Sequence, residues 1–220
     1  MATRKKGLGA AAGLLPVESS YLGTAVDVVA QTTFTFSAQT IGNAASPHHV
    51  AVLITSGTNG STAVTSVTVD GQACDIIIQQ DGGGATRSII AVTSAPLTAT
   101  SGDIVVTYAS SVGACRIGFY EVFNLDSTTP IASGSDGGTA ATTLAANLTS
   151  VKDGFALITA GHEGTTGAAI FSADFTKDYD AAISIRESVG ASALTVGSTV
   201  EVDMDLGSSF REGYCWATFR

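Results

Sequence analysis

Carboxylates are the residues of this chain whose spacing most clearly suggests chemistry. Glu201, Asp203 and Asp205 alternate with apolar residues, so on a β-strand their side chains share one face. Oxygen ligands of this kind bind hard cations such as Ca²⁺. The alternative is the solvated face of an edge strand, where charges discourage pairing with another chain. We favour the edge strand and keep the three acids as weak metal candidates.

A second acidic group lies in a segment that we expect to be a loop or hairpin, and it comprises Asp174, Asp178 and Asp180. It lacks the spaced glycine of an EF-hand loop, so it too is only a weak candidate for a cation site. Phe175 and Tyr179 lie among these acids. Exposed aromatic rings provide flat apolar platforms for sugars. We therefore take Phe175 and Tyr179 as the possible glycan contacts.

The patterns of known catalytic sites are missing from the sequence. His48 and His49 are adjacent, and adjacent strand residues point to opposite faces, so the pair does not suit a single metal ion. His162 precedes Glu163 in a glycine-rich segment, without a His-Glu-x-x-His motif. There is also no Gly-x-Ser-x-Gly elbow and no phosphate-binding loop. We predict that the chain is not an enzyme and needs no cofactor.

The chain has three cysteines, an odd and small number. An odd count argues against a disulfide framework. All three lie in apolar strand-like contexts, which favours buried free thiols. A bridge between one pair stays open at this point. The cysteines are Cys74, Cys115 and Cys215.

The charge of the chain is unevenly distributed. It carries 10 basic and 19 acidic residues, a net charge of −9. Arg4, Lys5 and Lys6 are three of the basic residues, so the remainder has 7 basic against 19 acidic residues, a net charge of −12. Such a surface repels nucleic acid, which we exclude as a partner. Only 13% of residues are charged, which is low for a cytosolic enzyme and favours a secreted, surface or virion protein.

The first fifteen residues differ from the rest in being built from Gly, Ala and Leu. They imitate a signal peptide poorly, because the apolar run is short, diluted by glycine and followed by Pro16. No apolar stretch reaches the roughly 20 residues of a membrane span, so we expect no membrane partner. We interpret residues 1–23 as an extended basic arm that anchors the chain to an assembly; the alternative is a solvated basic end. The arm residues expected to make contact are Arg4, Lys5, Lys6, Leu8, Leu14 and Leu15.

The remainder, residues 24–220, is predicted to form a single antiparallel β-sandwich. About a dozen short apolar or alternating stretches are separated by turn signals, as in sandwiches and barrels. No stretch has the capping residues and 3.6-residue period of a helix. A long loop over Asp126–Gly138 is expected to cross between sheets. The predicted strands are Val26–Phe36 in part, His49–Thr55, Val64–Val69, Cys74–Ile78, Arg87–Thr93, Ile104–Tyr108, Cys115–Phe123, Thr143–Leu148, Gly154–Thr159, Ala168–Phe171, Ala181–Ile185, Thr199–Met204 and Tyr214–Phe219.

The order of features from His48 to Asp180 resembles a known module. The segments are HVAVLIT, VTSVTVDGQAC, RSIIAVTSAPL, SGDIVVTYASSVGACRIGFYEVFNLDSTTPI and DGFALITAGHEG. They resemble a jelly-roll-like β-sandwich module of tailed-bacteriophage virion proteins, found also in some bacterial surface proteins. The resemblance covers more than half of the chain and consists of core strands and turns. It implies a fold and a setting, and no catalytic residues.

These observations lead to two expectations. The first is a structural protein of a tailed-phage virion, anchored by its arm and projecting as a capsid decoration, fibre or tail-appendage module. Its partners would be other virion proteins and copies of itself, with a trimer favoured. The second is a carbohydrate- or host-receptor-binding module on a virion or bacterial surface.

Overall fold

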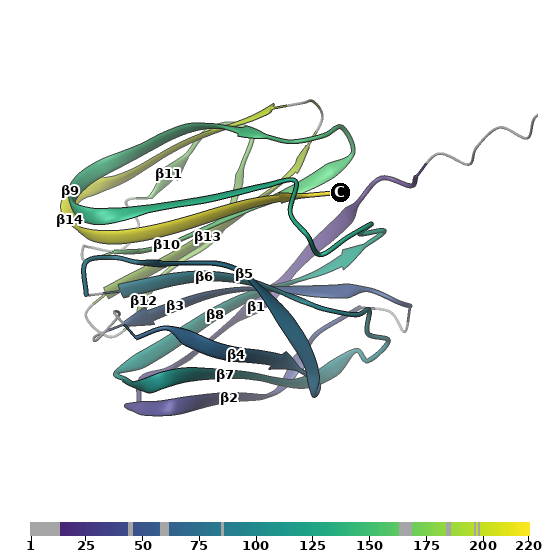
Figure 1. Cartoon of the computed structure of the whole chain (residues 1–220), viewed down its shortest axis with the longest axis horizontal. Coiled ribbons are helices and arrows are strands. Elements are labelled where there is room, and N and C mark those ends of the chain that lie inside the picture. The colour runs from purple at the N-terminus through teal and green to yellow at the C-terminus, as the bar shows by residue number, and fades with distance from the viewer. Residues whose placement is uncertain are drawn as a thin grey trace, which may run out of the picture.

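The computed structural model describes residues 14–43, 46–57, 62–84, 86–162, 169–183, 186–195, 197 and 199–220; for 138–146, 186–187 and 202–211 it describes the backbone alone. The described residues form β-strands and no helix, which confirms the all-β sandwich predicted from the sequence. Figure 1 shows the strands stacked in layers, with β2 and β7 at one side of the molecule and β9 and β14 at the other.

The first eight strands form one antiparallel sheet that folds over on itself. Their order is β1-β8-β3-β6-β5-β4-β7-β2. The half β1-β8-β3-β6 thus faces the half β2-β7-β4-β5, which is the pairing of an eight-stranded jelly roll. The strands are β1 (Glu18–Asp27), β2 (Gln31–Thr40), β3 (His49–Gly57), β4 (Val64–Val69), β5 (Gln72–Asp81), β6 (Thr86–Thr93), β7 (Ser101–Val112) and β8 (Ala114–Phe123).

The later strands form a second antiparallel sheet against the jelly roll. Its order is β11-β14-β10-β13-β12, and β9 pairs with β14. The long strands β9 and β14 form a ribbon that curves back over this sheet (Figure 1), with a register shift between Asp205 and Phe210. The strands are β9 (Ala132–Thr149), β10 (Gly154–His162), β11 (Ile170–Phe171), β12 (Thr176–Ile183), β13 (Arg186–Thr195) and β14 (Thr199–Phe219).

Three apolar cores follow from these layers. The interior of the jelly roll is filled by side chains such as Phe34 and Phe36, whose alternation with exposed threonines puts them on one face of β2. A second core, with Tyr120 and Phe155, joins the jelly roll to the second sheet. The third lies between the second sheet and the ribbon. β3, β8 and β10 are buried along nearly their whole length because they have layers on both faces.

Several strand boundaries differ from the sequence prediction. β1 begins at Glu18, so the last residues of the expected arm belong to the jelly roll. β9 runs through residues 133–138, where we expected a break, and β14 is one continuous strand rather than two. β13 was not predicted. These segments are rich in Gly, Ser and Ala, so they carry little of the hydrophobic alternation that indicates a strand. Cross-strand pairing places them in the sheet instead.

Within the part of the chain that the structure describes, no helix has the length and apolar character needed to cross a membrane.

Candidate functional site

Asp178 does not lie in a loop but in β12, at a bulge between Lys177 and Tyr179. Bulges re-aim side chains, and here both Asp178 and Tyr179 contact the jelly roll. The Asp178 carboxylate accepts hydrogen bonds from the hydroxyls of Tyr120 and Ser192, each at 2.8 Å. Burial raises the pKa of Asp178, although both hydrogen bonds lower it. This carboxylate therefore links the two sheets, a structural role.

The other two acids of this group turn to different partners. Asp180 forms an ion pair with Lys177 at 3.2 Å. An Asp174 carboxylate oxygen accepts a hydrogen bond from the backbone N–H of Glu201 at 3.3 Å. The three carboxylates are thus engaged separately, and no group of three metal-binding side chains occurs among the described residues.

Phe175 and Tyr179 are buried, with 7% and 8% of their surface exposed. Phe175 belongs to the core under the ribbon, and Tyr179 to the core between the sheets. Neither ring can serve as an exposed sugar platform, so the predicted glycan contact is corrected at both positions. The sequence suggested exposure because acidic neighbours surround the two rings, whereas the tertiary fold packs both rings into apolar cores.

The alternating acids of residues 201–205 lie on a strand, as predicted. Glu201 is exposed, and Asp203 and Asp205 pair through their backbones with Ala145 and Thr143 of β9. The strand therefore has β9 as a neighbour over this stretch and is not a bare edge there. The side chains of Asp203 and Asp205 lie outside the described residues.

The histidines of the first sheet serve the backbone. His48 contacts the carbonyl oxygens of Ser46 (2.7 Å) and Ile41 (3.0 Å) through its two ring nitrogens. His49 contacts the carbonyl of Thr93 at 2.8 Å. These contacts fix the loop before β3 and the end of β6. His162 is buried in β10, opposite Glu212 of β14 in the sheet register.

The cysteines are three free thiols. Cys115 and Cys215 are buried, and Cys74 is half-buried. No pair of the three cysteines therefore forms a disulfide.

The remaining candidate is the junction at which residues 14–17 join the sandwich. The guanidinium of Arg220 donates hydrogen bonds to the carbonyls of Leu15 (3.0 Å), Asp153 (2.8 Å) and Leu14 (3.4 Å). Charge-assisted hydrogen bonds of this type are among the stronger ones. One residue at the end of β14 therefore fixes both the incoming segment and the β9–β10 connection.

Two further contacts fix the same segment. The Asn124 side-chain amide donates to the Pro16 carbonyl at 2.9 Å, and the Val17 N–H donates to the Asp153 carbonyl at 2.9 Å. Val17 is buried. The path of the chain is thus set from Leu14 onward by three different connections of the fold.

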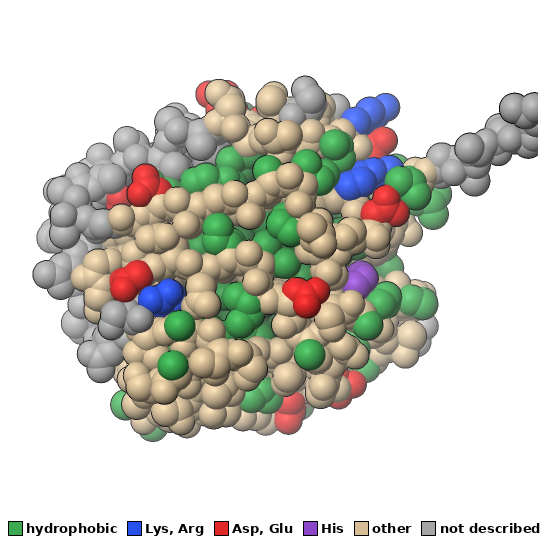
Figure 2. All heavy atoms as spheres, viewed as in Figure 1, with side chains coloured by type: hydrophobic (Ala, Val, Ile, Leu, Met, Phe, Trp, Pro, Cys, Tyr) green, Lys and Arg blue, Asp and Glu red, His purple; other side chains and the backbone are tan. Residues whose placement is uncertain are grey.

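Apolar side chains are exposed at this junction. Leu14 and Leu15 are 60% and 65% exposed, and together with Asn124, Leu125 and Asp126 they line a pocket of about 220 Å³. Leu194, which neighbours the Thr195 that contacts Asp153, is also exposed. Figure 2 shows hydrophobic side chains beside acidic and basic ones at the upper right of the described part of the molecule. We call Leu14, Leu15, Leu125 and Leu194 the apolar rim.

Leu14 and Leu15, which we predicted to be arm contacts, lie at this junction. No role was predicted for Arg220, Asn124 or Asp153. No local motif marks these three residues, because they meet only through the tertiary fold. Arg4, Lys5, Lys6 and Leu8 lie outside the described residues.

In comparisons with known proteins, no protein-family model and no curated protein matches the chain.

Proposed function

We propose that this chain is a non-enzymatic structural subunit of a tailed-phage virion, anchored through the segment before β1. The observation that carries the proposal is the junction. Arg220, Asn124 and Asp153 hold residues 14–17 by hydrogen bonds, and Leu14 and Leu15 of the apolar rim are exposed there. An exposed apolar cluster with a polar border is typical of a protein interaction site.

The architecture supports the same assignment. Jelly rolls recur in viral capsid proteins as well as in lectins and cupins. In this chain the interior of the roll is filled by large apolar side chains from both facing sheets. Because a fold does not by itself fix a function, the virion setting rests on the resemblance of residues 48–180 to phage virion modules. The acidic body and the basic Arg4-Lys5-Lys6 triplet suit attachment to an acidic neighbour.

The first test is the presence of the chain in purified particles of the phage that encodes it. Mass spectrometry of density-purified virions is expected to detect it in a fixed ratio to the major capsid protein. Its presence only in the soluble fraction of the lysate would overturn the proposal.

The second test removes residues 1–13 and leaves the junction intact. A deletion beyond this point would remove the buried Val17 and part of β1, so loss of folding would confuse the result. The truncated chain is expected to keep the unfolding midpoint of the full chain but to be absent from particles. As a matched control, Ile170→Ser changes one exposed apolar residue outside the rim, leaves residues 1–13 in place and is expected to be incorporated normally. Normal incorporation of the truncated chain would rule out anchoring by this segment.

A further inference from the structure

β1 is a peripheral strand of the jelly roll. It lies at one edge of the eight-stranded sheet and pairs with β8, with a bulge between Tyr21 and Gly23. None of its ten side chains, all of them described, is fully buried. Elements with few buried contacts open at low free energy. Opening of β1 therefore removes no fully buried side chain from the cores, although Tyr21, Leu22 and Ala25 pack against them.

The connection from β1 to β2 is short and held in one conformation. It comprises residues 28–30, and it crosses from one edge of the folded sheet to the other. The Asp27 carboxylate accepts hydrogen bonds from the Val29 N–H (2.8 Å) and from the Gln31 side-chain amide (2.7 Å). Three residues span at most about 10 Å. The two hydrogen bonds stabilise the closed turn, and it is the shortness of the hinge that favours exchange of the element that it connects.

Exposed valines gather at this hinge. Val26, Val28 and Val29 are 44%, 57% and 65% exposed. In the closed chain these three apolar side chains are exposed to water, which is unfavourable. An opened hinge would run alongside the opened hinge of a second copy, where the valines of both copies can pack against each other.

From these three observations we infer that β1 exchanges between two copies of this chain. In the exchanged dimer, residues 14–27 of each copy pair with β8 of the other. The contacts of Tyr21 with Tyr120 and Tyr179 (ring centroids 5.3 and 6.2 Å apart) then form between copies instead of within one. The closed and exchanged forms share all contacts except those at the hinge, so valine burial there decides the balance.

This inference rests on the proposed function only in assigning assembly to the N-terminal region. It names a second copy as the partner of β1. The anchoring proposed for residues 1–13 is a separate interaction, with a different virion protein.

A cross-linking experiment on the full chain tests the exchange. Glu18 and Phe123 are register partners in β1 and β8, and neither is fully buried. After mild oxidation, the Glu18→Cys/Phe123→Cys variant is expected to run at twice the chain mass on a non-reducing gel. Thr33→Cys/Thr107→Cys is the matched control, because Thr33 and Thr107 lie in β2 and β7 with their hydroxyls 3.5 Å apart. It is expected to cross-link within one chain. A monomeric Glu18→Cys/Phe123→Cys product that has lost two hydrogens would overturn the exchange.

A second measurement does not depend on cysteine variants. Inserting Gly-Ser-Gly after Val29 relieves the hinge and is expected to convert the dimer to a monomer in light scattering. The same insertion between Asp70 and Gly71, an exposed turn, serves as the control and is expected to leave the dimer unchanged. An unmodified chain that stays monomeric over the accessible concentration range would equally contradict the inference.

These outcomes are separate from those of the proposed function. Absence from virions overturns the virion role and leaves the interchain cross-link unaffected. A monomeric cross-link product overturns the exchange and leaves anchoring by residues 1–13 standing.

Discussion

The Tyr179 ring lies between a glycine of the jelly roll and a glycine of the second sheet. A β-carbon at Gly118 would lie 2.2 Å from the ring, and one at Gly190 would lie 2.3 Å from it. Both positions therefore need glycine for a reason of space, since any other side chain displaces Tyr179. Tyr179 is one of the buried side chains of the core between the two sheets.

Gly118→Ala is expected to lower the free energy of unfolding by about 1–3 kcal/mol, because the methyl group overpacks the inter-sheet core. Urea unfolding followed by tyrosine fluorescence measures the change. Gly197→Ala is the control, since a β-carbon there meets nothing within 4 Å, and it is expected to change stability by less than about 0.5 kcal/mol. Equal effects of the two substitutions would show that the ring can move at little cost.

Glu212 gives the folded chain a pH dependence near neutrality. Burial, together with the nearby Asp136, raises the pKa of Glu212 from 4.5 to about 7. Between these values the folded state binds more protons than the unfolded state. The stability contributed by this group is therefore full below pH 4.5 and is lost as the pH rises through about 7.

Wild-type protein is expected to lose roughly 1–2 kcal/mol more stability than Glu212→Gln between pH 5 and pH 8, with solvent screening already allowed for. The glutamine stays neutral over this range, so it removes the proton linkage and preserves the shape. Urea titrations of both proteins at the two pH values measure the difference. If the stability of both proteins fell equally between the two pH values, the pH dependence would come from a group other than Glu212.

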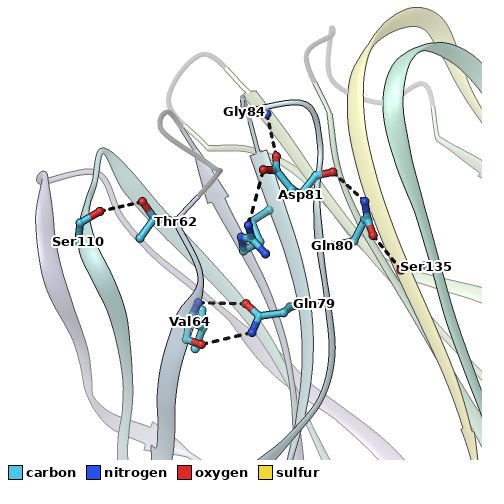
Figure 3. A network of polar contacts seen from close by, with 9 residues as sticks. Thr62, Val64, Gln79, Gln80, Asp81, Gly84, Ser110 and Ser135 are labelled. Carbon is cyan, nitrogen blue, oxygen red and sulfur yellow. Dashed lines mark hydrogen bonds and ion pairs between the residues drawn. The ribbon is translucent and has the colours of Figure 1, made fainter.

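At the scale of elements, β4 and β5 separate after a short paired stretch. They pair at Thr68–Ala73 and Val69–Gln72. Farther from the turn, the side chain of Gln79 makes the hydrogen bonds that a neighbouring strand would make. Its amide oxygen accepts a hydrogen bond from the Val64 N–H at 3.1 Å, and its amide nitrogen donates one to the Val64 carbonyl at 3.4 Å. Figure 3 shows this pair together with Gln80, which reaches Ser135 of β9. One side-chain amide thus satisfies the backbone where the roll folds over.

Gln79→Ala is expected to destabilise the chain by about 1–2 kcal/mol, because it leaves a half-buried N–H and carbonyl unpaired. Hydrogen exchange at the Val64 amide is expected to accelerate. Exchange in the centre of β3 is expected to change only as much as the lower free energy of global unfolding requires. Gln72→Ala, whose side chain bonds Ser94 at the surface, is the control with little effect. Unchanged exchange at Val64 would mean that water replaces the amide without loss.

The jelly roll and the second sheet are joined by the core that lies between them. Cys115 lies inside the roll, and Cys215 lies between the two sheets. Burial raises the pKa of Cys115 to about 12 and raises that of Cys215 as well. Both thiols are therefore unreactive in the folded state and report on opening of their own core.

Thiol labelling in low urea is expected to give the same opening free energy for Cys115 and Cys215, because the shared core makes the sheets unfold together. Mass spectrometry of labelled peptides measures both sites in one sample. Earlier labelling of Cys215 would show instead that the second sheet separates from an intact roll.

The fold class and most strands of the roll could be predicted from the sequence, because hydrophobic alternation and turn residues are local signals. Phe34, Phe36 and the segment HVAVLIT indicated buried faces that the structure confirms. The burial of Tyr179, the bulge at Asp178 and the meeting of Arg220 with Leu14 and Leu15 were decided by the tertiary structure alone. Each depends on which strands become neighbours across long sequence separations, and register and layer contacts of that kind leave no pattern within any one segment.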